Sequence, residues 1–246
     1  MREAVIRKIL NLNRQFYQQM AEPFARSRAF IQPGFLQLAT HLPDPCPALL
    51  DVGCGDGRLG RFLLAKERIG QYHGVDFSAP LLKLAAAQTA GGQFTQRDIS
   101  RSDCLTDLGQ FDAVACLATL QHLPGRTSRV GLLRAMAACL RPGGRLVLSN
   151  WQFYDNARQQ RKLLDWSTIG LQPSDVEPGD YLLSWRRGGS GRRYVAYIDQ
   201  PETEELAAEA GLHCLHHFRA DGKEGNLNLY TVMAPIGDEP DASSSL

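Results

Sequence analysis

The hydrophobic residues near the start of the chain recur at intervals of three and four positions, the spacing of one helix face. One or two amphipathic helices are therefore expected over residues 4–26, and another over 34–42. A proline-rich segment follows and ends the pattern, because proline cannot continue a helix. We expect residues 1–44 to form a helical cap ahead of the main domain.

From residue 48 onward, short apolar runs alternate with stretches of helical spacing. Strands are expected over 48–53, 72–77, 93–98, 111–120 and 145–151, and helices over 58–67, 79–90 and 128–140. Pro142 and Gly143 follow the last of these helices as stop signals. Such alternation predicts an α/β domain with a mainly parallel sheet covered by helices on both faces.

The alternation breaks after residue 151, which indicates an insertion over 152–198. We expect it to contain a helix over 152–166 and a β-hairpin whose strands, 180–185 and 193–198, flank a turn rich in glycine and arginine. Such an insertion could cover a substrate site as a lid or recognise the substrate directly.

The strand and helix pattern then returns. A helix over 202–211 and strands over 212–218 and 228–234 complete the expected elements. One domain is therefore expected over 45–236. The remaining segment, 237–246, has few apolar residues and is expected to be a disordered tail.

Composition and charge narrow the function classes only slightly. With 27 basic and 26 acidic residues the formal net charge is +1, so a nucleic-acid partner would need a local basic patch. The cysteines form no Cys-x-x-Cys pair, so no metal site is expected, and reduced thiols favour the cytoplasm. No apolar run approaches the roughly 18 residues of a membrane helix, and the charged N-terminus does not resemble a signal peptide.

The segment DVGCGDG, residues 51–57, carries the main chemical signal. Gly53, Gly55 and Gly57 follow a strand and open a helix, where backbone N–H groups can approach a ligand closely. A dinucleotide fingerprint needs a glycine at position 58, and Arg58 stands there instead. Arg58 at this position disfavours the pyrophosphate of a dinucleotide. A dehydrogenase, which would bind such a dinucleotide, is therefore a less favoured alternative.

Three carboxylates accompany this turn. Asp51 ends the first strand and suits a ligand that carries an ammonium group. Asp76 ends the second strand, 19 residues after Gly57, where a carboxylate can accept both hydroxyls of a ribose. Asp98 follows the third strand and could bind the amine of an adenine. A ribose, an adenine and a cationic amino-acid end are the parts of S-adenosylmethionine (SAM).

Residues 45–151 resemble the class I SAM-dependent methyltransferases, because five motifs occur in that family's order: DVGCGDG, GVDFS, QRDIS, FDAVACLATLQHL and LRPGGRLVLSN. The resemblance implies a Rossmann-like, doubly wound, mainly parallel seven-stranded sheet. It also implies SAM as cofactor. By this resemblance Gly53, Cys54 and Gly55 would bind the methionine part of SAM, and Asp51 would support their loop. Asp76 would bind the ribose. The adenine and nearby cofactor atoms would be contacted by Phe77, Asp98, Ile99 and Leu117.

Both ends of the chain resemble a narrower family, the enzymes that methylate a modified wobble uridine of tRNA to form a methyl ester. The matching residues are Tyr17, Ala21, Phe24, Ser27 and Arg28 before the sheet, and Trp151, Leu183–Trp185, Arg193–Tyr194 and Gly225–Asn226 after its fifth strand. The family's paired histidines become Gln121–His122 here, which is a departure. This resemblance implies tRNA as substrate, and eukaryotic members also need a small activator subunit.

Methyl transfer requires an aligned nucleophile and the exclusion of water. Arg28 is the candidate catalytic cation, able to hold a substrate carboxylate or the carboxylate of the cofactor. His122 is the candidate general base for a hydroxyl or amine substrate, with a packed loop histidine as the alternative. The candidate substrate-binding residues are Tyr17, Trp151, Arg186, Arg187, Arg192 and Arg193.

Three hypotheses follow. The first is a SAM-dependent methyltransferase that acts on tRNA through a local basic patch that includes the hairpin arginines. The second is a small-molecule O- or N-methyltransferase whose insertion is a lid over an apolar pocket. The third is a non-catalytic module of the same fold, which the complete set Asp51, Asp76 and Asp98 disfavours.

Overall fold

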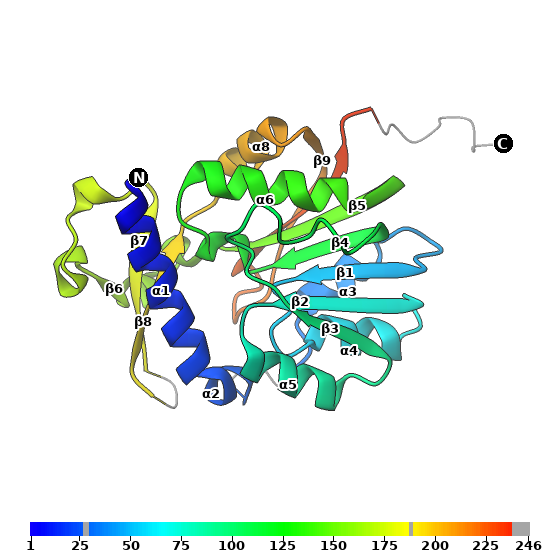
Figure 1. Cartoon of the computed structure of the whole chain (residues 1–246), viewed down its shortest axis with the longest axis horizontal. Helices are drawn as coiled ribbons and strands as arrows, with labels where there is room; N and C mark the ends of the chain where they lie inside the picture. The colour runs from blue at the N-terminus through cyan, green and yellow to red at the C-terminus, as the bar shows by residue number, and fades with distance from the viewer. Residues whose placement is uncertain (27–29, 187–188, 238–246) are drawn as a thin grey trace.

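The computed structural model describes residues 1–26, 30–186 and 189–237. Arg28, Arg187 and most of the segment expected to be a tail lie outside the described residues. Within the described part, a large sheet with helices on both faces is joined to a smaller sheet that lies to one side of it (Figure 1).

The large sheet has seven strands in the order β3-β2-β1-β4-β5-β10-β9. They are β1 (Ala48–Val52), β2 (Gln71–Asp76), β3 (Gly92–Gln96), β4 (Phe111–Leu117), β5 (Leu140–Trp151), β9 (Leu212–Ala220) and β10 (Asn228–Pro235). Strands β1 to β5 pair in parallel, whereas β10 lies antiparallel between β5 and β9. The predicted mainly parallel, seven-stranded sheet is confirmed.

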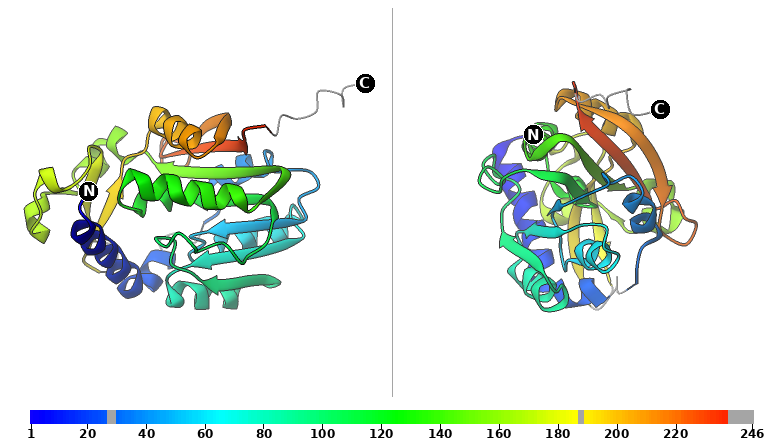
Figure 2. Two further views of the ribbon diagram at one scale, coloured as in Figure 1. Left: turned by 45° about the horizontal axis from the view of Figure 1, so that its top comes forward. Right: turned by 90° about the vertical axis from the view of Figure 1, so that its right-hand side faces the viewer.

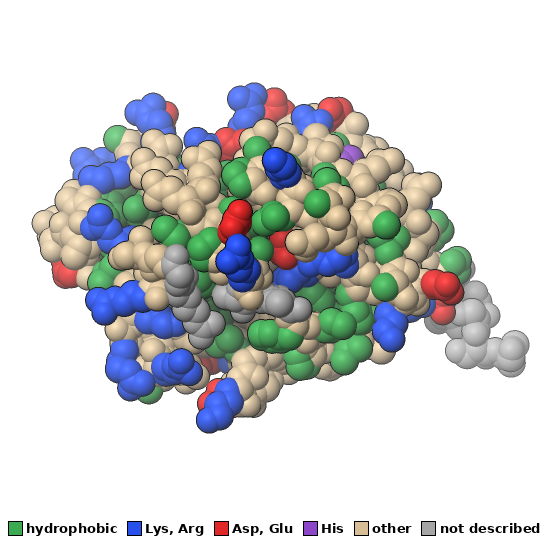
Figure 3. Space-filling model, turned by 90° about the horizontal axis from the view of Figure 1, so that it is seen from below, with side chains coloured by type: hydrophobic (Ala, Val, Ile, Leu, Met, Phe, Trp, Pro, Cys, Tyr) green, Lys and Arg blue, Asp and Glu red, His purple; other side chains and the backbone are tan. Residues whose placement is uncertain are grey.

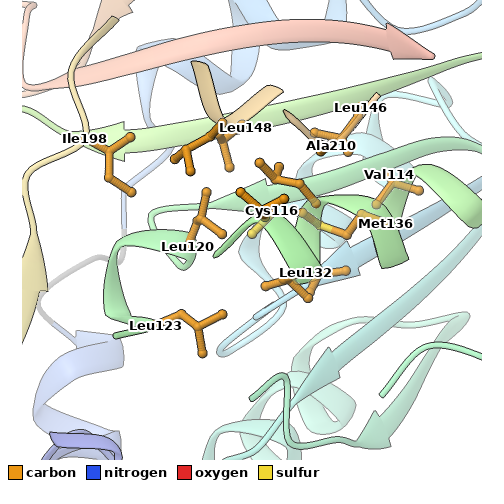
Figure 4. Close-up of a cluster of buried hydrophobic side chains, with 14 of the residues drawn as sticks. Val114, Cys116, Leu120, Leu123, Leu132, Met136, Leu146, Leu148, Ile198 and Ala210 are labelled. Atoms are coloured by element: carbon orange, nitrogen blue, oxygen red, sulfur yellow. The ribbon is translucent and has the colours of Figure 1, made fainter. Parts of the chain in front are cut away.

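Two helical layers cover this sheet because its central strands are apolar on both sides. Leu49 packs with α3 (Pro33–Ala39), α4 (Arg58–Ala65) and α5 (Ala79–Gln88), whereas Leu50 packs with α6 (Arg126–Ala138) and α8 (Gln200–Glu209). Figure 4 shows part of the second cluster, with Cys116 and Leu148 of the sheet and Met136 of α6 among its members.

The first two N-terminal helices and the insertion lie together beyond the carboxyl ends of the parallel strands (Figures 1 and 2), whereas α3 covers a face of the large sheet. Helix α1 (Glu3–Gln19) packs on the small antiparallel sheet of β6 (Leu163–Leu164), β7 (Asp180–Trp185) and β8 (Gly191–Ala196), and α2 (Ala21–Arg26) packs on α5. The predicted hairpin is confirmed as β7 and β8. Gly191 permits the close approach of α1, since a Cβ there would lie 2.7 Å from the Phe16 ring.

The helix expected over 152–166 is wrong. The chain forms only short elements there and just after: η2 (Phe153–Asp155), α7 (Ala157–Gln160), β6, η3 (Trp166–Ile169) and η4 (Pro173–Asp175). Phe153 and Leu163 pack with Leu183 and Val195 of the small sheet, so their apolar side chains serve a sheet surface instead of a helix face. Side-chain caps favour the short turns, as at Asn156, which accepts hydrogen bonds from the first N–H groups of α7.

Two boundaries also differ from expectation near the fourth and fifth strands. Strand β4 ends at Leu117, and the chain turns into the 3-10 helix η1 (Leu120–His122). Helix α6 ends at Ala138, and Pro142 and Gly143 lie within β5 instead of stopping a helix. The pairing of β4 with β5 is irregular between Phe111 and Ala113, and such an irregularity accommodates a proline that has no N–H for the ladder.

Candidate active site

The glycine turn after β1 is held in place by main-chain hydrogen bonds. The N–H groups of Gly53 and Cys54 donate to the carbonyl oxygen of Val75 over 2.7 and 3.0 Å. Gly53 has a φ of 77°, and a Cβ there would lie 2.3 Å from Thr119, so this position requires glycine. Gly55, with a φ of 57°, faces open space within 4 Å. The Cys54 thiol is buried near Gly74 of β2, so Cys54 contributes backbone to the turn.

Asp51 lies buried near this turn. The Tyr72 hydroxyl donates a hydrogen bond to its carboxylate over 2.7 Å. Burial raises the pKa of Asp51 to about 7. This placement suits the predicted role of supporting the glycine loop, and a cationic ligand nearby would favour the ionised form.

Asp76, at the end of β2, connects the glycine turn to the following loop. Its carboxylate accepts hydrogen bonds from the N–H of Gly55 over 2.9 Å and the N–H of Ser78 over 2.8 Å. Burial raises the pKa of Asp76 to about 6. Each oxygen can accept a second hydrogen bond, as two ribose hydroxyls would require. Phe77 follows half-buried, with its ring centroid 6.0 Å from that of Tyr17.

Asp98 has a partner that the sequence did not indicate. Its carboxylate forms an ion pair with Arg14 of α1 and accepts a 2.7 Å hydrogen bond from the Ser100 hydroxyl. Both charged side chains are about one-third exposed, at 37% for Arg14 and 34% for Asp98. Ile99 and Leu117 are half-buried next to the apolar clusters on the two faces of the sheet.

His122 and Tyr17 form a hydrogen-bonded pair at the carboxyl end of β4. The Tyr17 hydroxyl lies 2.8 Å from Nε2 of His122, and Nδ1 of His122 lies 3.0 Å from the carbonyl oxygen of Tyr194. A carbonyl oxygen can only accept, so Nδ1 carries the proton. In neutral His122 the unprotonated Nε2 then accepts from Tyr17, and the pair is oriented to take up a proton.

Asn13 holds this pair in position and was missed by the sequence analysis. Its side-chain amide donates to the carbonyl oxygens of His122 and Tyr194 and accepts from the Tyr194 N–H, over 3.2, 3.2 and 2.8 Å. Asn13 shares the buried face of α1 with Ile9 and Phe16. A polar residue on an apolar helix stripe was the signal that could have identified it.

The predicted substrate residues separate into two groups. Trp151 and Arg193 lie in contact beyond the carboxyl end of β5, with the guanidinium 5.0 Å from the ring centroid. Arg186 and Arg192 are exposed, and Arg192 donates to the Thr168 carbonyl oxygen on the other side of β8. Arg187 and the predicted catalytic Arg28 are not among the described residues, so nothing is added to their predicted roles.

The described part of the chain contains no group of three or more metal-ligating side chains suited to a metal ion. Its helices are too short or too polar to span a bilayer. A hollow of about 460 Å³ lies between β9, β10 and the start of α8, lined in part by Tyr197, His217 and Arg219. Because it includes no predicted cofactor residue, we assign the chemistry to the glycine turn instead.

Comparison with known proteins gives consistent matches. Residues 50–146 match a family described as a methyltransferase domain. The ubiquinone biosynthesis O-methyltransferase of Chromobacterium violaceum is 28% identical over 67% of this chain and 63% of its own length. The protein of the same name from Xanthomonas axonopodis pv. citri is 36% identical over 48% of this chain and 49% of its own length. The chain thus spans less than two thirds of these two relatives.

Solved structures share the fold. A SAM-bound amino pentose methyltransferase from Micromonospora echinaspora superposes with a TM-score of 0.60 and 21% identity, over 87% of this chain and 96% of that one. Together the matches confirm the predicted class I methyltransferase fold, and the activity and the SAM cofactor that this fold favours are taken up as proposals. They give no support to the wobble-uridine family, and the cytoplasmic location, the activator subunit and the individual site residues stay predictions.

Proposed function

We propose that this chain transfers the methyl group of SAM to a hydroxyl or amine of a small molecule. The observation that carries the proposal is that α1, η1 and β8 meet at the Tyr17–His122 pair, in the loop whose Thr119 hydroxyl donates to the Gly53 carbonyl oxygen of the glycine turn. Three aromatic rings, those of Phe16, Phe24 and Phe77, pack edge-on against the Tyr17 ring. Such an interior suits a compact acceptor and excludes water.

The names of the relatives support the same choice. The two curated relatives are named for O-methylation in ubiquinone biosynthesis, and the Micromonospora echinaspora protein is named for an amino pentose. These names describe small acceptors. At the identities found, they support a substrate class for this chain and not a particular substrate.

The residues around the glycine turn fit the parts of SAM. Asp76 offers carboxylate oxygens to ribose hydroxyls, Phe77 offers a ring face to adenine, and Gly55 leaves open space beside the turn. SAM, when bound, supplies an electrophilic methyl group on a sulfonium. The chain's own residues orient the acceptor, exclude water and receive the proton.

Tyr17 and His122 provide the path for that proton. We infer that the Tyr17 oxygen receives the acceptor's proton while its own proton passes to Nε2 of His122 over the existing 2.8 Å hydrogen bond. The Tyr194 carbonyl then stabilises the imidazolium through Nδ1. In this scheme His122 acts through Tyr17. It can therefore take part in proton transfer although both of its ring nitrogens lie within hydrogen-bond distance of protein groups.

A tRNA substrate remains the second candidate, because several arginines of the insertion are exposed. They are Arg158, Arg161, Arg186 and Arg192. Seen from below, Lys and Arg side chains gather at the end of the molecule where the insertion lies (Figure 3). A phosphate backbone could bind such a surface in a salt-dependent manner.

Labelled SAM separates the two candidates. Methyl-labelled SAM is incubated with unmodified total tRNA and, separately, with an extract of small metabolites, using wild-type protein and Tyr17→Phe. We expect label in the metabolite fraction, and much less with Tyr17→Phe at equal SAM binding by calorimetry. Label in tRNA alone, lost when the four exposed arginines are changed to Ala, contradicts the proposal in favour of the second candidate.

A further inference from the structure

Arg193 is a buried cation without an acidic partner. Only 4% of its surface is exposed, and none of the ion pairs found in the described part of the chain includes it. Its guanidinium lies 5.6, 5.0 and 5.2 Å from the ring centroids of Phe16, Trp151 and Trp185. Ring faces attract a cation, but they offer no hydrogen-bond acceptor in the plane of the guanidinium.

Two donors in this cluster have no acceptor. Nε of Arg193 and Nε1 of Trp151 are both buried, and neither has a hydrogen-bond partner among the described residues. Buried donors in folded proteins are nearly always paired, so two unpaired donors in contact indicate a missing acceptor. Since one of them is cationic, an anion satisfies the pair best.

The strand geometry directs Arg193 toward the site. In the β7–β8 pairing, Trp185 lies opposite Gly191 and is thus the diagonal neighbour of Arg193 on one face of the small sheet. The next residue, Tyr194, offers the carbonyl that orients His122, and Phe16 precedes Tyr17 on α1. The two donors therefore lie in the same aromatic enclosure as the Tyr17–His122 pair.

We propose that Arg193 and Trp151 bind a carboxylate of the acceptor, so that the substrate is an aromatic or other flat hydroxy or amino acid. This inference rests on the proposed function, because it names the substrate class of that same site. A carboxylate fits since its two oxygens can accept from a guanidinium and an indole N–H together. The rings around the donors suit a flat, apolar body on the same molecule.

Intrinsic fluorescence offers a readout that does not require turnover. Two of the three tryptophans, Trp151 and Trp185, flank the guanidinium, so an anion bound there changes their emission. The probes are benzoate, phenylacetate and 4-hydroxybenzoate, each with its neutral amide, titrated at pH 8 with S-adenosylhomocysteine present. We expect the acids to bind about 10- to 100-fold more tightly than the amides, as for a hydrogen bond to a charged group.

Arg193→Met removes the charge and fills the same space. The acid preference should disappear, and the thermal midpoint should stay equal or rise because an unpaired buried charge is replaced by an apolar side chain. Arg193→Lys keeps the charge and should retain part of the preference, which keeps the test valid if the Met variant folds poorly. The matched control is Arg145→Met, since Arg145 lies on β5 and bonds only local carbonyls in the described structure.

The outcomes separate this inference from the proposed function. Equal binding of acids and amides, binding of neither, or an acid preference that survives in Arg193→Met overturns the carboxylate site. A lower midpoint of Arg193→Met with unchanged preference assigns Arg193 a packing role only. Methyl transfer to neutral metabolites leaves the proposed function standing while this inference fails. An acid preference without SAM binding contradicts the proposed function alone.

Discussion

At the scale of single residues, the turn that we assign to the cofactor leaves a local sequence signal, whereas the contacts of the proposed proton path leave none. Glycines with positive φ and a carboxylate at a strand end leave a local sequence signal, so Gly53, Gly55 and Asp76 could be named in advance. Asn13 and Arg14 act through partners more than 80 residues away, which no local pattern reveals. His122 was identified, but its dependence on Tyr17 required the fold.

We expect Asp76 to make SAM binding dependent on pH. Its pKa is about 6 in the free protein, raised by burial, and the ionised carboxylate is the form that accepts two hydroxyls. SAM affinity should therefore rise as the pH increases from 5 to 7 and then level off. Asp76→Asn should weaken SAM binding at pH 7 by about 10- to 100-fold and lose this part of the pH dependence. Calorimetry at four pH values measures both effects; an unchanged profile in the Asn variant would assign the titration to Asp51 instead.

Tyr17→Phe tests the proton path. Loss of the phenolic oxygen should lower kcat by about 10²- to 10⁴-fold, the range for a lost general acid–base group, without changing SAM affinity. With an acceptor that is already ionised in solution, the same substitution should lower kcat much less. Rates with the acceptor from the metabolite extract, measured from pH 6 to 9, check this. An equal loss for ionised and protonated acceptors contradicts a role in proton transfer.

At the scale of elements, the spacing of apolar residues predicted secondary structure well where a helix or strand packs within a single layer of the fold. Strands β1 to β5 and their helices matched expectation apart from their ends, because their apolar residues pack between the large sheet and the helices that cover it. Residues 152–166 failed because their apolar side chains cover a small sheet formed later in the chain. Apolar residues that pack on a sheet formed later in the chain can therefore have the same spacing in sequence as the apolar residues of a helix.

The attachment of α1 to β8 depends on Asn13. Asn13→Leu keeps the size but leaves the buried Tyr194 N–H without its acceptor and removes one hydrogen bond from each of two carbonyl oxygens. We expect the free energy of unfolding to fall by about 1–3 kcal/mol and amide exchange in α1 to speed up. Asn11→Leu is the control, since Asn11 is exposed on the same helix. Equal unfolding of the two variants would show that apolar contacts alone hold α1.

At the scale of the whole molecule, α1 joins three separate parts of the site. It contacts the loop after β4 through Tyr17, the small sheet through Asn13, and the segment after β3 through Arg14. The proposed cofactor and substrate sites would therefore share one helix, and binding at one site would change the affinity of the other. Sequence order could not show this, because the three contacts belong to elements far apart in the chain.

The Arg14–Asp98 pair makes this coupling measurable. If Asp98 binds the adenine amine, Arg14 competes for the same carboxylate, and Arg14→Gln should tighten SAM binding severalfold. Stability should change little, within about 1 kcal/mol, because both side chains are about one-third exposed. Arg7→Gln is the matched control, since Arg7 pairs with Glu3 on the solvent side of the same helix. Weaker SAM binding in Arg14→Gln, with Arg7→Gln unchanged, would instead place Arg14 among the cofactor's own contacts and make α1 part of the SAM site.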